Sequence, residues 1–216
     1  MSITKNLNQI KSGLPKEVTL IAVSKTKPNE VIQEAYDSGQ RIFGENKVQE
    51  LVQKYEDLPK DIEWHLIGHL QTNKVKYVAP FVNMIHAVDS MKLLKEINKQ
   101  ASKNERVINC LLQVKIAEEE SKFGLSKTDT ENVLNSEEVK QLTNIKIVGL
   151  MGMATNSSDE SQVKEEFKSL YTFFKKFSIL NSQFSILSMG MSGDYKIAIQ
   201  EGSTMIRVGS TIFGGR

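Results

Sequence analysis

A lysine, an arginine and a glycine-hydroxyl segment are the residues of this chain whose types and spacing suit shared chemistry. Lys25 follows the apolar run 20–23 and Ser24, so it stands at the end of an expected strand. A lysine that is partly desolvated near another cation loses proton affinity, and its free amine attacks an aldehyde to form a Schiff base. Lys27 is the neighbour expected to face solvent. A plain solvated strand end is the alternative for Lys25.

Arg207 lies in the last expected strand, in the segment "TMIRVGST" (204–211). Side chains alternate between the two faces of a strand, so Arg207 shares a face with Met205 and Gly209, while the opposite face packs on helices. A guanidinium keeps its charge when it is buried and needs an acceptor, either a carboxylate or an electron-rich atom of a ligand. A structural ion pair is the alternative.

The residues that follow Arg207 suit a phosphate group. Gly209, Ser210 and Thr211 offer an open backbone, amide donors and two hydroxyls, which together can cradle a phosphate. An ordinary glycine turn is the alternative. Ser188 ends the preceding expected strand and either reaches the same phosphate or is a turn hydroxyl. An amine, a phosphate cradle and a cationic donor suit pyridoxal 5′-phosphate (PLP), whose aldehyde, phosphate and ring nitrogen need those three partners.

Other polar residues are weaker candidates. Asn46 follows a short apolar run and either caps the next helix or donates to a ligand hydroxyl. His65 stands at a strand terminus and either lines the same cavity or is a core or turn histidine. His65 and His69 have a spacing that suits metal ligands on a helix, but the residues between them resemble a strand and a turn, so no metal site is expected. Cys110 is expected to be buried and inert.

Eight short apolar runs that alternate with longer amphipathic stretches must position these residues. Runs that are apolar throughout indicate a parallel sheet covered by helices on both faces. The predicted fold is a single-domain (β/α)₈ TIM barrel over residues 1–216, and an open doubly wound sheet is the alternative. A barrel of this kind carries its site at the C-terminal ends of the strands, with phosphate near the last two loops. The runs are residues 18–24, 41–44, 62–68, 83–88, 107–114, 145–151, 184–189 and 204–209.

Two stretches between these runs show clear helical patterns. In residues 158–177 the apolar side chains recur every three or four positions, which predicts one amphipathic helix. Residues 28–39 read similarly, with Pro28 suited to a first turn and Gly39 to a C-terminal stop.

The composition favours a small ligand in a reducing compartment. The chain has 216 residues, and its 28 Lys+Arg against 26 Asp+Glu give a net charge of +2, too balanced for a nucleic-acid or membrane partner. One cysteine allows no intrachain disulfide, and the first residues, "MSITKNLNQIKSG", lack the apolar core of a signal peptide. We therefore expect a cytoplasmic protein.

The chain also carries a series of motifs in a recognisable order. These are "AVSKTKP", "IFGENKVQE", "WHLIGHLQTNK", "SKFGLS", "VGLMGMAT" and "LSMGMSGDYKIAIQEGSTMIRVGSTIFGGR". They resemble the motifs of the pyridoxal phosphate homeostasis protein family, also called the PLP-binding protein family, from about Leu20 to Arg216. The resemblance implies a barrel similar to the N-terminal domain of bacterial alanine racemase, without that enzyme's second, β-rich domain.

The resemblance also implies roles for individual residues. Lys25 matches the lysine that forms the aldimine with PLP, and Arg207 matches the arginine that faces the pyridine nitrogen. Ser188, Gly209 and Ser210 match positions around the phosphate, whereas Asn46 and His65 fall in motifs that line the cavity.

This sequence departs from the family pattern at three places. His69 stands where proline is expected, Gly193 where an acidic residue is expected, and residues 152–154 vary a motif near the sixth strand. None of these positions touches the proposed covalent chemistry.

The arginine bears on how much catalysis to expect. An acidic residue keeps the pyridine nitrogen protonated and makes the ring a strong electron sink, whereas Arg207 leaves that nitrogen as an acceptor. Alanine racemase tolerates such an arginine but needs a second base from its second domain, which the resemblance does not lead us to expect in this chain, and Tyr195 is only a guess at a replacement. The leading hypothesis is a protein that holds PLP on Lys25 and buffers or delivers it, rather than an enzyme with robust activity.

Two other functions stay open on the sequence. One is a PLP-dependent amino-acid racemase or similar enzyme, and the other is a class I aldolase-type barrel in which Lys25 captures a phosphorylated sugar carbonyl. The expected partners of the carrier are PLP, amino acids and apo-PLP enzymes, and the expected state is a monomer or weak dimer.

Overall fold

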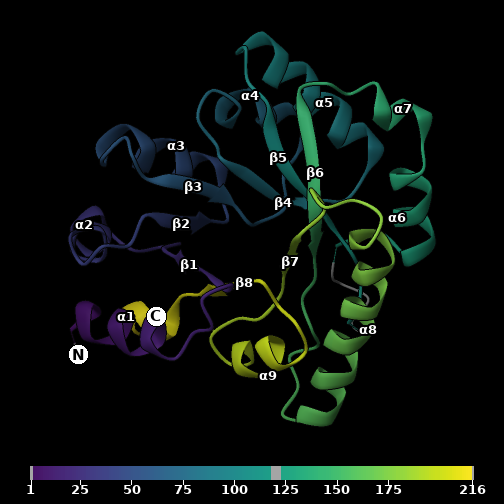
Figure 1. Cartoon of the computed structure of the whole chain (residues 1–216). Coiled ribbons are helices and arrows are strands. Elements are labelled where there is room, and N and C mark those ends of the chain that lie inside the picture. The colour runs from purple at the N-terminus through teal and green to yellow at the C-terminus, as the bar shows by residue number, and fades with distance from the viewer. Residues whose placement is uncertain (1, 118–122, 216) are drawn as a thin grey trace.

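Eight parallel strands close into a barrel in the computed structural model, which describes residues 2–117 and 123–215 (Figure 1). Each strand pairs with the next one along the chain, and β8 pairs with β1. The strands are β1 (Thr19–Val23), β2 (Ile42–Glu45), β3 (Glu63–Leu66), β4 (Met84–Val88), β5 (Ile108–Gln113), β6 (Ile145–Met151), β7 (Ile186–Ser188) and β8 (Met205–Val208).

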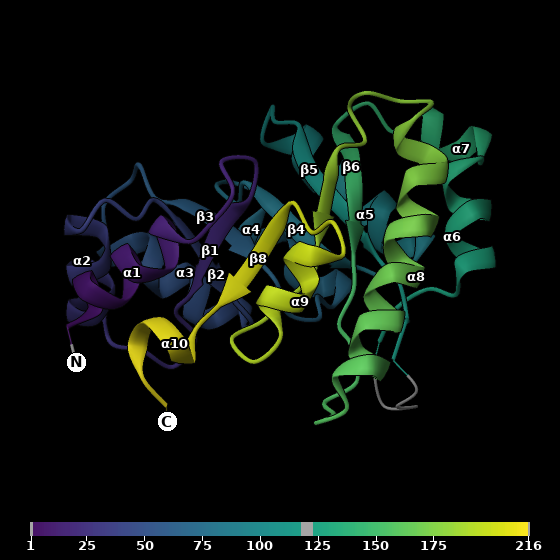
Figure 2. The same ribbon diagram turned by 60° about the horizontal axis from the view of Figure 1, so that its bottom comes forward.

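Helices alternate with the strands and lie outside the barrel (Figures 1 and 2). The 3₁₀ turn Thr72–Lys74 precedes α4. The α-helices are α1 (Ile3–Ser12), α2 (Asn29–Asp37), α3 (Val48–Asp57), α4 (Val75–Val78), α5 (Met91–Lys103), α6 (Lys127–Leu134), α7 (Glu137–Lys140), α8 (Glu160–Ser178), α9 (Tyr195–Gln200) and α10 (Ser210–Phe213).

The strand predictions are confirmed, because each of the eight apolar runs coincides with one of these strands, and β2 alone extends one residue past its run, to Glu45. The closed pairing excludes an open sheet. The two predicted helices are present as α8 and α2. Pro28 lies one residue earlier than expected, because it is the extended N-cap of α2 and not part of its first turn. Gly39 follows the helix with φ +84°, the left-handed conformation that glycine favours at such a stop.

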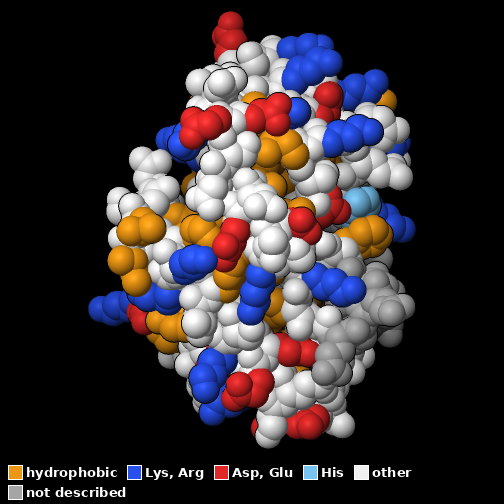
Figure 3. Space-filling model, turned by 90° about the vertical axis from the view of Figure 1, so that its right-hand side faces the viewer, with side chains coloured by type: hydrophobic (Ala, Val, Ile, Leu, Met, Phe, Trp, Pro, Cys, Tyr) orange, Lys and Arg blue, Asp and Glu red, His pale blue; other side chains and the backbone are white. Residues whose placement is uncertain are grey.

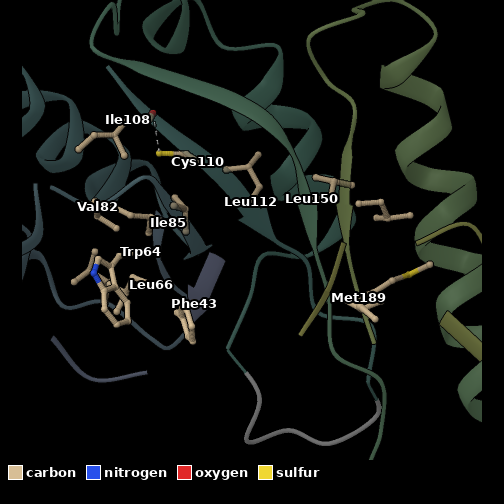
Figure 4. Close-up of a cluster of buried hydrophobic side chains, with 14 of the residues drawn as sticks. Phe43, Trp64, Leu66, Val82, Ile85, Ile108, Cys110, Leu112, Leu150 and Met189 are labelled. Atoms are coloured by element: carbon tan, nitrogen blue, oxygen red, sulfur yellow. Dashed lines mark hydrogen bonds between the residues drawn. The ribbon is translucent and has the colours of Figure 1, made fainter. Parts of the chain in front are cut away.

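The apolar side chains form two layers. The larger layer lies between the strands and the helices, and Figure 4 shows part of it, including Phe43, Trp64 and Cys110. Burial raises the pKa of the Cys110 thiol to about 12, in agreement with the expected inert side chain. The smaller layer fills the barrel interior and consists of Ile21, Met84, Ala87, Leu111, Met151 and Met205. Met205 therefore faces inward, as predicted for its face of β8.

The closure of β1 against β8 brings the two ends of the chain together. Ile21 pairs with Arg207 in this parallel ladder, and Ala22 pairs with Val208. The short helix α10 packs on α1 beside the closure, as Figure 2 shows. The segments that carry Lys25 and Gly209 are therefore neighbours at one end of the barrel.

The surface mixes charges of both signs. On the face drawn in Figure 3, basic and acidic side chains are interspersed, and no single sign dominates. Among the residues that the structure describes, no helix combines the length and the apolar character needed to cross a membrane.

Candidate functional site

A cavity of about 320 Å³ opens at the C-terminal ends of the strands, above the apolar interior of the barrel. This is the end at which barrels of this type carry their sites. Its lining includes five of the seven residues predicted to bind a cofactor: Lys25, Asn46, Arg207, Gly209 and Ser210. The prediction that Lys25 and the Gly209–Ser210 backbone face one cavity is therefore confirmed.

Lys25 and its neighbour Lys27 differ in the hydrogen bonds that their ammonium groups make. Lys27 Nζ donates to the carbonyl oxygens of Phe213, Gly214 and Gly215, each at 3.2 Å. Lys25 is half-buried at the cavity wall, and the described part of the chain offers its amine no hydrogen bond or ion pair. Among the described residues, the Lys25 amine is thus the one of the two without a partner, whereas Lys27 ties the C-terminal segment to the β1–α2 loop.

The backbone around Gly209 presents two converging amide groups. The amide nitrogens of Gly209 and Thr211 donate to Ser192 Oγ at 3.1 and 3.4 Å. Two converging N–H groups at the start of α10 are arranged as a phosphate oxygen requires, and Ser192 Oγ takes that acceptor position here. A Cβ on Gly209 would lie 3.0 Å from the Val23 carbonyl oxygen, so the close approach of β8 to β1 favours glycine.

Arg207 lies at the bottom of the cavity and is almost completely buried. Its guanidinium donates to Ser188 Oγ at 2.7 Å and to the Gly152 carbonyl oxygen at 3.0 Å. Burial lowers the pKa of Arg207 to about 10, an effect that the charge of Asp194 opposes. The side chain therefore remains cationic at neutral pH and points inward, as the alternation along β8 predicts.

A hydrogen-bonded chain of buried polar side chains runs from Arg207 across the barrel. His86 Nδ1 lies 3.1 Å from Ser188 Oγ, and His86 Nε2 lies 3.0 Å from His65 Nδ1. Burial lowers the pKa of His65 to about 4, and burial together with the nearby His65 and Arg207 charges holds the pKa of His86 well below its usual range. Both rings are therefore neutral at pH 7, and each has one donor and one acceptor nitrogen for the chain.

His65 and Ser188 consequently lie behind the cavity and not on its wall. The hydroxyl of Ser188 is already bonded to Arg207 and sits beside His86, so its role at a phosphate stays a prediction. The residues that sequence reasoning missed are His86, hidden in the apolar run 83–88, and Ser192. The sequence signal for Ser192 was its place beside Gly193, in the turn after the seventh strand.

The other sequence candidates lie partly on the cavity wall and partly outside the cavity. Asn46 does not cap α3, because the N-cap residue is Lys47, and the side chain of Asn46 lines the cavity instead. His69 lies outside the cavity, 3.2 Å from Asp89 Oδ2, with its ring stacked on Phe123. Gly193 and Met153, at two of the departures from the family pattern, both line the cavity.

The titratable groups on the cavity wall are few. Within residues 2–117 and 123–215, the ionisable side chains that line it are Lys25, Lys27 and Arg207. Tyr195, the guessed second base, lines a different groove between α1 and α9. The described wall therefore presents cations and hydroxyls but neither a carboxylate nor a phenol.

The fold and this site define a class of protein. A family model described as "Alanine racemase, N-terminal domain" matches residues 1–216, so the chain is a barrel of that family. Alanine racemase of Clostridium difficile 630 shares the fold, with a TM-score of 0.79 at 14% identity, and this chain covers 56% of the racemase chain.

Similar full-length proteins identify the family more narrowly. The pyridoxal phosphate homeostasis protein of Vibrio alginolyticus is 38% identical over an alignment of 230 positions, gaps included, which covers 100% of this chain and 98% of that protein. PipY of Synechococcus elongatus PCC7942, determined with PLP bound, superposes with a TM-score of 0.88 at 37% identity and covers 98% of this chain and 100% of its own. The chain belongs to the pyridoxal phosphate homeostasis protein family.

Proposed function

We propose that this protein binds PLP in the cavity at the C-terminal ends of the strands and serves the cell's vitamin B6 homeostasis. The observation that carries the proposal is the convergence, in one cavity of about 320 Å³, of an amine without a partner among the described residues, two converging backbone amides and an inward arginine. These groups come from opposite ends of the chain, and they match the aldehyde, phosphate and ring nitrogen of PLP. The PLP-bound structure of the relative PipY supports the same ligand.

The phosphate would lie at the start of α10. The amides of Gly209 and Thr211 already converge on an oxygen atom, Ser192 Oγ, so a phosphate oxygen can take the same place. The Ser192 hydroxyl would then be free to turn and donate to the phosphate. Ser210 lines the same cavity and adds a second hydroxyl. Ser188 also matches a phosphate position in the family pattern, and its hydroxyl accepts a hydrogen bond from Arg207.

Lys25 would hold the cofactor covalently as an aldimine, and Arg207 would face the pyridine nitrogen. Arg207 is fixed by two hydrogen bonds and keeps its charge, so it donates to the ring nitrogen and leaves no acid to protonate it. A ring that is not protonated at nitrogen withdraws electrons weakly. Asn46 would line the cavity wall beside the cofactor. His65 would support Arg207 through His86 and Ser188.

The site is better suited to holding and releasing PLP than to catalysing a reaction with it. Racemisation needs two bases on opposite faces of the substrate, and on the described cavity wall Lys25 is the one amine not held by other groups. An incoming amine can displace Lys25 by transaldimination without a second base. We propose that amino acids or apo-PLP enzymes take the cofactor in this way, and that residues 1–216 act as one cofactor-binding domain in the cytoplasm.

Absorption spectroscopy tests the proposal. The purified protein mixed with PLP should develop a visible band that is lost in Lys25→Ala and kept in Lys27→Ala. A wild-type protein that stays colourless after reconstitution would rule out PLP, and a band that survives in Lys25→Ala would rule out Lys25. Incubation with single L-amino acids in deuterated water then separates carrier from racemase, because sustained α-hydrogen exchange over many turnovers would show catalysis.

A further inference from the structure

A cluster of three charged side chains lies under the loop that carries Lys25. Glu45 ends β2, and Glu50 and Lys54 lie on α3. Lys54 is only 4% exposed, and its Nζ donates to Glu45 Oε1 at 2.7 Å, to Glu50 Oε1 at 2.6 Å and to the Ser24 carbonyl oxygen at 2.8 Å. All three protons of this ammonium group are therefore used.

The cluster holds both chain neighbours of Lys25. On one side, Ser24 Oγ donates to Glu45 Oε1 at 2.6 Å, and the Ser24 carbonyl oxygen accepts from Lys54. On the other side, the Thr26 amide donates to Glu50 Oε1 at 2.5 Å. Thr26 has φ +64°, a left-handed conformation that a β-branched residue adopts only when its surroundings impose it. The same lysine thus links the two anchors on either side of Lys25.

The anchors determine where the Lys25 side chain begins. Ser24 points outward toward α3, so the alternation along the chain turns Val23 and Lys25 toward the cavity, which both residues line. No described group holds the flexible Lys25 side chain itself, so the position of its amine depends on the backbone at its base. An amine held near a bound aldehyde reacts much faster than one that must search for it.

We propose that Lys54 is a positioning residue for Lys25: by fixing Ser24 and, through Glu50, Thr26, it directs the Lys25 amine at the bound cofactor. The inference rests on the proposed function, because it concerns the bond between Lys25 and PLP. Lys54 touches neither the cavity nor the cofactor site and acts only through its neighbours.

The cluster is poorly designed for stability alone. A buried ion pair returns little net stability, because the desolvation of both charges offsets their attraction. Glu45 Oε2 is buried without a hydrogen-bond partner among the described residues, and burial raises the pKa of this carboxyl group despite the nearby Lys54. An apolar contact would fill the same space at lower cost. The arrangement is better explained by the geometry that it imposes on the loop.

Binding of two ligands tests the proposal. PLP has an aldehyde for Lys25, whereas pyridoxine 5′-phosphate has an alcohol there and binds without the covalent bond. In Lys54→Met we expect the affinity for PLP to fall by about tenfold or more and that for pyridoxine 5′-phosphate by less than about threefold. Amide hydrogen exchange at Thr26 should accelerate as well. Lys99→Met, at an exposed position of α5, is the matched control and should bind both ligands like wild type.

Two more variants keep the test decisive if Lys54→Met does not fold. Glu45→Gln with Lys54→Met removes one buried charge of each sign. Glu50→Ala, at a half-buried position, removes the Thr26 anchor and one hydrogen bond of Lys54 but leaves the Ser24 anchor in place. Each should show the same selective loss of PLP binding. Equal losses for both ligands would mean a merely structural role, and an unchanged affinity for PLP would exclude the positioning role. If wild type binds both ligands alike, the proposed aldimine fails and the inference fails with it.

Discussion

The buried histidine pair makes the stability of this protein depend on pH. His65 has a pKa of about 4 in the folded chain, against an ordinary value of about 6.5 in the unfolded chain. Between these values the unfolded chain binds a proton that the folded chain refuses, so stability falls as the pH falls. The gap of about 2.5 pH units, at about 1.4 kcal/mol a unit, amounts to about 3 kcal/mol, of which about 2 kcal/mol is lost between pH 7 and pH 5. His86 shifts in the same direction and adds to the loss.

Urea unfolding at pH 5, 6 and 7 measures this contribution. The variant His65→Gln keeps a hydrogen-bonding side chain beside His86 but cannot titrate. We expect the difference in unfolding free energy between pH 7 and pH 5 to be smaller in this variant than in wild type by about 2 kcal/mol. The comparison between variants is needed because Glu45, whose pKa is raised by burial, contributes a slope of the opposite sign.

His69→Gln is the matched control, because it removes a histidine that lies outside the cavity and whose side chain is 39% exposed. The difference in unfolding free energy between pH 7 and pH 5 should change more in His65→Gln than in this control, each compared with wild type. If this difference in unfolding free energy agrees between wild type and His65→Gln within about 0.5 kcal/mol, then His65 is not held neutral in the folded protein. The hydrogen-bonded series of side chains behind Arg207 would then not exist in this form.

Three further predictions concern the cavity and its loops. Ser192→Ala removes a hydroxyl from the phosphate cradle and should weaken pyridoxine 5′-phosphate binding about tenfold by calorimetry; unchanged or tighter binding would mean that Ser192 only fills the cradle. Arg207→Gln keeps an amide donor but loses the charge, so we expect a shifted visible band of the PLP-loaded protein and a loss of about 1 to 3 kcal/mol of stability. An unshifted band would contradict the placement of Arg207 at the ring. Gly190→Ala should cost roughly 1 to 3 kcal/mol in urea unfolding, because Gly190 has φ +97° and a Cβ there would lie 2.6 Å from Ala198 Cβ. Gly193→Ala should cost little, because no described residue other than its chain neighbours lies within 4 Å of the Cβ position; equal losses in both variants would refute the steric explanation.

The barrel was predictable because each of its strands is recognisable from a short stretch of the sequence. A strand that is covered on both faces needs a continuous apolar run, and each of the eight runs is such a strand. The inward direction of Arg207 followed from alternation along β8, and the shared cavity of Lys25 and Gly209 followed from closure of the barrel. Each of these steps needed only the strand order and the period of two.

The polar support of the site was not predictable in the same way. His86 sits inside an apolar run and reads as a core residue, and its partners come from β3 and β7. Lys54 reads as a surface lysine of an amphipathic helix, but it is buried against Glu45, which ends β2, and the Ser24 carbonyl oxygen. The contact of Ser192 with the Gly209 amide depends on the position of α10, which follows the last strand. Such contacts form between segments that are far apart in the sequence. The spacing of residues along the chain therefore does not reveal them.

The central claim is that Lys25, and not Lys27, bonds to PLP. The most direct measurement is to reduce the PLP-loaded protein with borohydride, digest it and map the phosphopyridoxyl group by mass spectrometry. We expect the group on Lys25, because Lys27 is held by three carbonyl oxygens and the Lys25 amine has no partner among the described residues. A group found on Lys27 or on any other lysine, or no stable adduct at all, would contradict this account.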